Sequence, residues 1–429
     1  MLAKYLKDRS GNFGMMAAIL MVPLIGAAGI AVDFAHAVTV KSDLQAAADA
    51  AALAAVADSS AGLAEAQAMS GDGRVTMSEA DALKFFDINA GGATYSILEA
   101  NAAVVKEGIT IKSVVTFKAA VETTLTKVFG KEHMIVSGSA TAEYQTQAYR
   151  DFYLLLDNTP SMGVGATPTD VKKMVANTSD KCAFACHIVK NGVEDRNSYY
   201  NLAKKLGVTV RINVVAQATA SLMDTAVASR RDPSQFRMAI YTFGKKAEDT
   251  KLLEVSPLTA DLAKAKQKAA LIDLMSIPYQ GYDNDQQTDF DRALTQMGAT
   301  MGTPGSGATA VSPEKIVFFV SDGVGDSYKP NACTKKTTNG RCQEPIDTKY
   351  CKLLKDKGYK IAVLYTTYLP LPTNGWYNTW IKPFQEEIGL RMRECATDGL
   401  FFEVSPTEGI SEAMNALFKR IIRAPRLTS

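Results

Sequence analysis

The chain has 429 residues, of which 47% are hydrophobic and 21% charged, so it is long enough for two or three domains with packed cores. Its 47 basic and 45 acidic residues give a net charge of +2, without a block of Lys or Arg. This balance excludes a protein built to bind polyanions, and nucleic acid is not an expected partner.

The first predicted element is a helix over residues 13–32, a run that contains no charged side chain. As a helix it is about 30 Å long, which matches the hydrocarbon thickness of a bilayer. Lys4, Lys7 and Arg9 precede it, and the residues immediately after it are not basic. The positive-inside rule then places residues 1–12 in the cytoplasm as a short tail and the rest of the chain outside.

Two alternatives for this segment involve cleavage. Ala35-His36-Ala37 fits the A-x-A pattern of a signal-peptidase site, which would release the rest of the chain. A type IV prepilin-like signal would need a Gly followed by an apolar run with an early Glu. Gly11 and Gly14 are present, but the run contains no Glu. We therefore expect an uncleaved membrane anchor.

Residues 33–60 are rich in Ala, the residue with the highest helix propensity, and are predicted to continue the helix as a stalk or packing helix. The order of RSGNFGMMAAIL, PLIGAAGIAVDFAHA and LQAAADAAALAA resembles the N-terminal segment of TadG-like proteins of the tight-adherence (Flp) pilus-assembly family. The exit from the apolar run at Asp33, followed by the repeated Ala-Ala-Asp-Ala pattern, is its most specific part. The resemblance implies a bacterial inner-membrane protein whose bulk is periplasmic and whose partners include pilus-assembly components.

Residues 75–147 are predicted to form a small α+β domain. A helix is expected over residues 75–89, a hairpin turn at residues 106–108, a short helix over 121–128 and a strand over 134–142. No pattern of catalytic residues occurs here, so we expect a role in spacing or interaction.

Residues 151–422 show strands alternating with helices, the pattern of an α/β fold with a doubly wound, Rossmann-like parallel sheet. The predicted strands are FYLLLD, FRMAIYTFG, KLLEVSPL, KIVFFVSDG, KIAVLYTTY and LFFEVSP, and the predicted helices cover residues 213–229, 262–275, 289–301 and 409–422.

Three segments of this region carry oxygen-bearing side chains at strand or helix ends. Asp157, Thr159 and Ser161 follow the first strand, Thr288 opens a helix, and Asp322 follows a later strand. The carboxyl ends of parallel strands meet at one edge of a sheet, where ligands bind. Oxygen ligands are those that Mg²⁺ prefers. With only two carboxylates, the cation would keep positive charge and an open position for a carboxylate of a partner.

This set resembles the metal-ion-dependent adhesion site (MIDAS) of von Willebrand factor A domains, whose first motif is Asp-x-Ser-x-Ser. Asp157, Thr159 and Ser161 match that motif, Thr288 matches the threonine of the second loop, and Asp322 matches the aspartate of the third. Thr159 replaces the usual serine and keeps the hydroxyl, while its methyl group narrows the site. The resemblance implies a von Willebrand factor A domain with Cys-containing insertions, a bound Mg²⁺ (or Mn²⁺ or Ca²⁺), and a protein ligand that offers an acidic side chain.

An even number of cysteines behind a membrane segment indicates an oxidising compartment. A local disulfide between Cys182 and Cys186 is favoured over zinc, because zinc needs about four ligands and the chain has only three His. The insert NACTKKTTNGRCQEP is expected to be an exposed loop closed by a disulfide, and the two last cysteines could pair across the fold. The six disulfide candidates are Cys182, Cys186, Cys333, Cys342, Cys351 and Cys395.

The predicted function is metal-dependent adhesion to a protein partner, in Flp pilus assembly or surface attachment. A structural envelope scaffold with a non-functional metal site is the alternative, and metal-dependent partner binding distinguishes the two. An enzyme is not expected. A haloacid dehalogenase-like phosphatase would need a second Asp two residues after its nucleophile, and Thr159 occupies that place.

Overall fold

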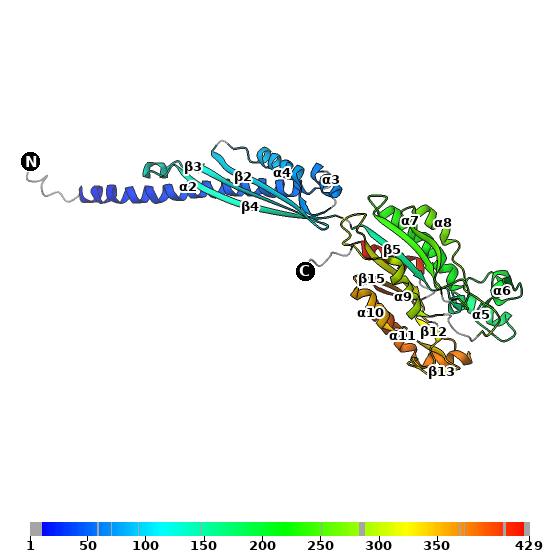
Figure 1. Ribbon diagram of the computed structural model, residues 1–429. Helices are drawn as coiled ribbons and strands as arrows, with labels where there is room; N and C mark the ends of the chain where they lie inside the picture. Colours follow the sequence, from blue (N-terminus) through cyan, green and yellow to red (C-terminus); the bar gives the residue numbers. More distant parts are fainter. Residues whose placement is uncertain are drawn as a thin grey trace, which may run out of the picture. The chain divides into compact units, whose positions relative to one another are not determined.

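The computed structural model describes residues 11–57, 60–69, 71–92, 94–146, 148–249, 251–282, 288–368, 370–372, 374–405 and 409–423. Lys4, Lys7 and Arg9 of the predicted cytoplasmic tail lie outside these residues. The chain divides into two compact units, unit 1 (Met1–Thr146) and unit 2 (Gln147–Ser429). It is a mixed α/β chain with an N-terminal apolar helix, as the sequence predicted (Figure 1).

Unit 1 begins with the helix α2 (Gly11–Ala55), which joins the predicted membrane run to the Ala-rich segment without a break (Figure 1). Pro23 lies inside it. Between Met15 and Phe34 its large apolar side chains are exposed. Among the described residues, α2 is the one helix long and apolar enough to cross a membrane.

The rest of unit 1 is an antiparallel sheet with two short helices. The sheet order is β1-β2-β3-β4, and β2 and β3 form the predicted hairpin. The elements are β1 (Gly73–Arg74), β2 (Tyr95–Glu107), β3 (Thr110–Glu122), β4 (His133–Gln145), α3 (Ala61–Ala68) and α4 (Thr76–Asn89).

The second half of α2 packs on this sheet rather than standing apart as a stalk. Leu44 and Ala48 of α2 share one apolar core with Val115 of β3 and Ala140 of β4. Alanine side chains let the helix approach the sheet closely, and the Gln45 side-chain amide donates to the backbone carbonyl of β4. The Ala-rich segment and the sheet are therefore parts of one structure.

The short helix predicted over residues 121–128 is wrong. β3 continues to Glu122, and only a 3₁₀ turn, η1 (Thr126–Phe129), follows. The physical reason is Asp33 on α2, whose carboxylate accepts hydrogen bonds from the backbone N–H groups of Thr124, Leu125 and Thr126. Asp33 is far from these residues in the sequence, so the sequence pattern around residues 121–128 does not reveal the contact.

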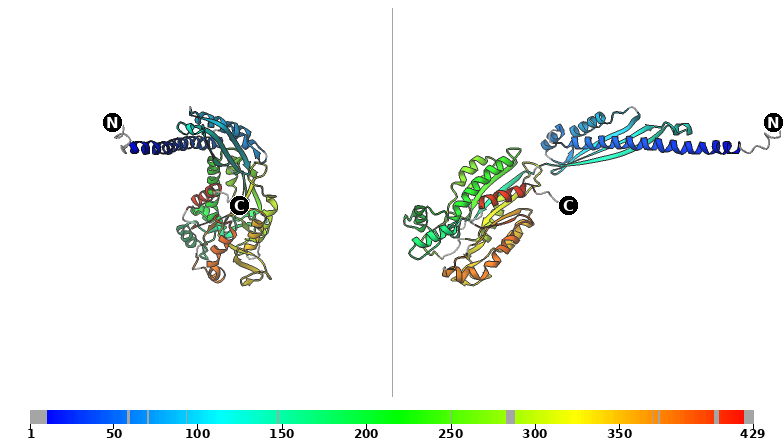
Figure 2. Two further views of the ribbon diagram at one scale, coloured as in Figure 1. Left: turned by 90° about the vertical axis from the view of Figure 1, so that its left-hand side faces the viewer. Right: turned by 180° about the vertical axis from the view of Figure 1, so that it is seen from behind.

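Unit 2 is built on a six-stranded sheet of order β16-β15-β11-β5-β8-β9. The sheet lies between helices (Figures 1 and 2). All neighbouring strands are parallel except the β8–β9 pair. The strands are β5 (Arg150–Leu156), β8 (Phe236–Thr242), β9 (Leu253–Thr259), β11 (Glu314–Ser321), β15 (Lys360–Thr366) and β16 (Phe401–Val404).

Helices cover both faces of this sheet, which is why the central strands read as continuous apolar runs. Apolar side chains of α7 (Arg211–Ser229), α8 (Leu262–Ala269) and α12 (Ile410–Arg423) pack on one face. Those of α9 (Phe290–Met301), α10 (Thr348–Asp356) and α11 (Gln385–Cys395) pack on the other.

The helix predicted over residues 262–275 is too long, because α8 ends at Ala269. The following residues hold the loop after β5. The Asn158 side chain donates to the Asp273 carbonyl at 3.0 Å, and the Met275 N–H donates to the Asn158 carbonyl at 2.7 Å. In a longer helix, the Asp273 carbonyl and the Met275 N–H would have formed bonds within the helix. Here they bind Asn158 and hold the loop after β5 in place.

The predicted exposed loop over residues 331–345 is only partly a loop. Its second half is β14 (Arg341–Pro345), which pairs with β12 (Val324–Tyr328) and β13 (Thr337–Thr338). Cys342 on β14 is fully buried and forms a disulfide with Cys333, with a Cα–Cα distance of 5.7 Å. The disulfide therefore fastens a surface segment to a small sheet.

A second disulfide joins Cys351 on α10 to Cys395 at the end of α11, with a Cα–Cα distance of 5.1 Å. Both residues are fully buried in the apolar layer on that face of the sheet. The bond connects two helices that are 44 residues apart in the chain.

Candidate functional site

The first segment of the site is the turn that follows β5. The Asp157 N–H donates to the Val320 carbonyl of β11, which continues the strand pairing to the sheet edge. Asn158 then donates its side-chain amide to the Gly244 carbonyl and accepts from the Phe243 N–H, so the turn is tied to the loop after β8. These bonds fix the backbone from which the next hydroxyls project.

Asp157 is the centre of a hydrogen-bond network. Its Oδ1 accepts from the backbone N–H of Thr159 at 3.0 Å and from Thr159 Oγ1 at 2.7 Å. Its Oδ2 accepts from the Ser321 hydroxyl at 2.6 Å. Thr288 Oγ1 donates to Thr159 Oγ1 at 2.8 Å, and the Ser161 hydroxyl lies 3.4 Å from the same atom.

Asp322 completes the cluster. Its Oδ1 accepts from the Val324 N–H at 3.3 Å, and its side chain lies near the Ser161 hydroxyl. The structure thus brings together all five residues that the sequence singled out: Asp157, Thr159, Ser161, Thr288 and Asp322.

Both carboxylates are completely buried. Burial raises the pKa of Asp157, and burial together with the nearby Asp157 carboxylate raises the pKa of Asp322. Two buried anions close together favour a cation between or beside them. The donor set, which is made only of carboxylate and hydroxyl oxygens, fits a hard divalent cation such as Mg²⁺.

Arg211, at the first turn of α7, is a part of the site that sequence reasoning missed. Its guanidinium NH1 lies 3.3 Å from Asp322 Oδ2, and the side chain is almost completely buried. Its Nε has no hydrogen-bond partner within the described part of the chain. Arg211 is therefore a fixed positive charge that neutralises part of the carboxylate charge.

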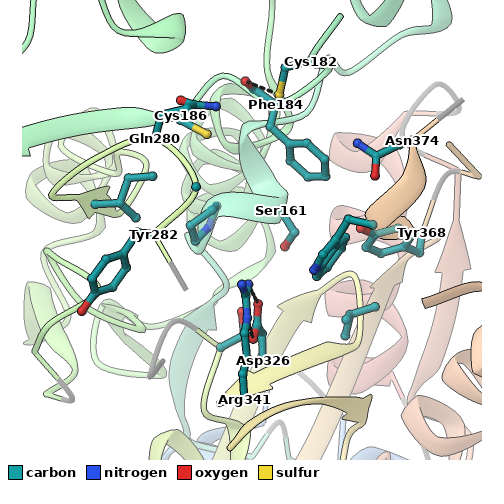
Figure 3. A pocket seen from close by; sticks show the side chains of 16 residues that line it. Ser161, Cys182, Phe184, Cys186, Gln280, Tyr282, Asp326, Arg341, Tyr368 and Asn374 are labelled. Atoms are coloured by element: carbon teal, nitrogen blue, oxygen red, sulfur yellow. Dashed lines mark hydrogen bonds and ion pairs between the residues drawn. The ribbon is translucent and has the colours of Figure 1, made fainter. Parts of the chain in front are cut away.

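A cavity of about 330 Å³ opens above the cluster (Figure 3). Ser161 and Thr288 line it on the side of the buried carboxylates. Most of the remaining wall is aromatic or apolar, and the ion pair between Arg341 and Asp326 forms one polar side. The larger side chains of the wall are Phe184, Ile277, Tyr282, Tyr368 and Trp376.

Cys182 and Cys186 also line this cavity, and the disulfide predicted between them is not formed (Figure 3). The Cys182 thiol instead donates to the Phe184 carbonyl at 3.7 Å, while the Cys186 side chain lies near the Gln280 side chain. Burial raises the pKa of both thiols, that of Cys186 to about 12. They are therefore protonated at neutral pH and poor nucleophiles.

The N-terminal segment is similar to a known protein family. Residues 11–58 match the model of the putative Flp pilus-assembly TadE/G-like family. This match covers the first helix and little more of the chain, and it supports a pilus-related role. No curated protein matches the chain.

Solved structures with weak similarity include several pilus proteins. The vWF domain of the type V pili tip protein Mfa5 from Porphyromonas gingivalis shares 11% identity over 66% of this chain and 99% of its own, with a TM-score of 0.37. The PilB minor pilin from Streptococcus sanguinis shares 9% identity over 77% of each chain, with a TM-score of 0.35. Proximal thread matrix protein 1 from the mussel byssus shares 12% identity over 64% of this chain and 46% of its own, with a TM-score of 0.35.

Proposed function

We propose that this chain is a membrane-anchored adhesion protein of Flp pilus assembly, whose unit 2 is a von Willebrand factor A-type domain that binds a partner protein through a divalent cation. The observation that carries the proposal is the convergence of two buried carboxylates and three hydroxyls at the carboxyl edge of the sheet, beneath a cavity. Asp157, Thr159, Ser161, Thr288 and Asp322 would hold the cation, which would supply a Lewis-acidic position facing the cavity.

The net charge of the metal-loaded site favours a partner that offers an acidic side chain. Ionised Asp157 and Asp322 contribute −2 and Arg211 contributes +1, which leaves −1. A divalent cation changes this sum to +1, since −1 + 2 = +1. One carboxylate from a partner would then neutralise the site, and a basic side chain would be repelled.

The cavity suggests that the partner is also recognised through an apolar side chain. Its aromatic wall would accept an apolar side chain next to the acidic residue, with Phe184 and Trp376 as contact surfaces. The partner is therefore proposed to offer an exposed acidic residue flanked by an apolar one.

A pair of substitutions at Thr159 tests this function. With a photo-crosslinking residue at the exposed cavity-lining position Gln280, isolated membranes should give the same partner crosslink for the wild type and Thr159→Ser, because both keep the hydroxyl. Thr159→Val keeps the shape but loses the oxygen. We expect it to reduce the crosslink about ten-fold, which corresponds to about 1.4 kcal/mol.

Removal of Mg²⁺ with EDTA should reduce the wild-type crosslink in the same way. Crosslinks of equal yield in all three proteins, with and without EDTA, would instead support the structural scaffold with a non-functional metal site.

The proposed topology makes a separate prediction. Lys4, Lys7 and Arg9 before the uncharged run should retain the N-terminus in the cytoplasm. A phosphatase reporter fused after Ser429 should be active, because it is exported, and one fused after Arg9 should be inactive. The reverse pattern would contradict a periplasmic unit 2, and a released soluble fragment would point to cleavage after Ala37.

A further inference from the structure

The loop between β3 and β4 carries an exposed apolar tip. Leu125, Val128 and Phe129 have 41%, 83% and 61% of their surface exposed. Lys127 and Lys131 lie on either side of Val128 and Phe129 in the sequence and are exposed as well. Large apolar side chains gathered on one loop of this kind mark a contact surface.

Hydrogen bonds to Asp33 hold the loop at one position along α2. Asp33 accepts hydrogen bonds from three consecutive N–H groups, those of Thr124, Leu125 and Thr126, at 2.6 to 3.0 Å. The Thr126 hydroxyl donates to the same carboxylate at 2.8 Å. Because the backbone is held directly, the loop cannot slide along the helix without breaking several bonds to a charged group.

From Asp33 the loop runs back along α2 toward the apolar run. A β-carbon added to Gly29 would lie 2.8 Å from Leu125 Cβ, and one added to Gly26 would lie 3.2 Å from the Phe129 ring. Gly26, Gly29 and Asp33 are spaced three and four residues apart and lie on one face of the helix. The two glycines provide the space in which the loop contacts the helix.

This contact fixes the depth of the tip. Gly26 lies six residues before Val32, the end of the uncharged run, which is about 9 Å along a helix. If residues 13–32 cross the hydrocarbon, Phe129 beside Gly26 lies below the hydrocarbon surface. The flanking lysines would reach the phosphate groups with their long side chains.

We propose that the β3–β4 loop, residues 123–131, inserts its apolar tip into the outer leaflet of the membrane that α2 crosses. This gives unit 1 a second membrane contact beside its helix and fixes the rotation of unit 1 about the helix axis. The inference goes beyond metal-dependent adhesion and is independent of the site in unit 2.

Fluorescence quenching in vesicles tests the insertion. The full chain is reconstituted in phosphatidylcholine–phosphatidylglycerol vesicles whose acyl chains are brominated, and wild-type emission from Trp376 and Trp380 is subtracted. Val128→Trp should be quenched nearly as strongly as Ile25→Trp in the helix. Glu107→Trp is the matched control and should not be quenched, because Glu107 is the last residue of β2 and lies at the hairpin, at the other end of β3 from the loop.

Gly29→Leu, introduced with Val128→Trp, should push the loop from the helix and weaken the quenching. An unquenched Val128→Trp beside a quenched Ile25→Trp would overturn the insertion. Lack of quenching at both positions would overturn it together with the membrane span itself. Neither result would bear on metal binding by unit 2.

Discussion

Asp157→Ala should abolish Mg²⁺ and Mn²⁺ binding by the full chain in detergent. Asp157 is one of the two carboxylates in the proposed ligand set, and it also accepts the hydrogen bonds that orient Thr159 and Ser321. Isothermal titration calorimetry of wild type and variant measures the effect directly. Equal binding by both proteins would show that the proposed cation site does not exist.

Asp289→Asn is the matched control for this experiment. Asp289 neighbours Thr288 and caps α9, where its side chain accepts from the Arg292 N–H. Asn preserves the cap and removes one negative charge from the same edge of the sheet. Metal binding should therefore survive in Asp289→Asn, and its loss there would point to a general charge effect rather than ligation.

Metal-free Asp157→Ala should remain folded, with a free energy of unfolding equal to or above that of the wild type. Burial raises the pKa of Asp157, so its ionised form destabilises the folded metal-free state at neutral pH. The substitution removes this unfavourable charge and the repulsion with Asp322. A large loss of stability in urea would contradict this electrostatic account.

Loss of the Cys351–Cys395 disulfide should be the most destabilising change outside the site. The bond closes a segment of 44 residues, for which the chain-entropy model gives about 4 kcal/mol. The pair Cys351→Ala and Cys395→Ala avoids burying new hydroxyl groups in the apolar layer. Urea unfolding followed by the fluorescence of Trp376 and Trp380 reports on unit 2 alone, because these are the only tryptophans.

The Cys333–Cys342 bond supplies the comparison. It closes only 9 residues, for which the same model gives about 2.5 kcal/mol. Cys333→Ala with Cys342→Ala should therefore lower stability less than the loss of the other disulfide. The opposite order would show that local strain or packing, rather than chain entropy, determines the contribution of each bond.

The convergence of Asp157, Thr288 and Asp322 could be predicted from sequence because a parallel sheet gathers its carboxyl ends at one edge. That prediction needed only the order of strands and the residues that follow them. The role of these residues as metal ligands stays a prediction. Arg211 could not be assigned in this way, since its contact with Asp322 depends on where α7 enters the fold after a long insertion.

The Ala-rich half of α2 shows a different limit of sequence reasoning. Its helical state followed from alanine propensity, but alanine is too weakly apolar to mark a buried face, so stalk and packing helix remained alternatives. The structure supplies the partner surface through Val115 and Ala140. Similarly, no local pattern pairs Cys182 with the Phe184 carbonyl or Cys186 with Gln280, because those contacts depend on how the loop lies over the cavity.

The packing of α2 on β4 also sets an order of events during translation. α2 ends at Ala55, whereas β4 ends at Gln145, so the helix is made 90 residues before the last strand that covers it. At about 5–20 residues per second this delay is roughly 5–20 s. During that time the stripe around Leu44 lacks its contact with β4, and a nascent chain in this state exposes apolar surface to which other chains can bind.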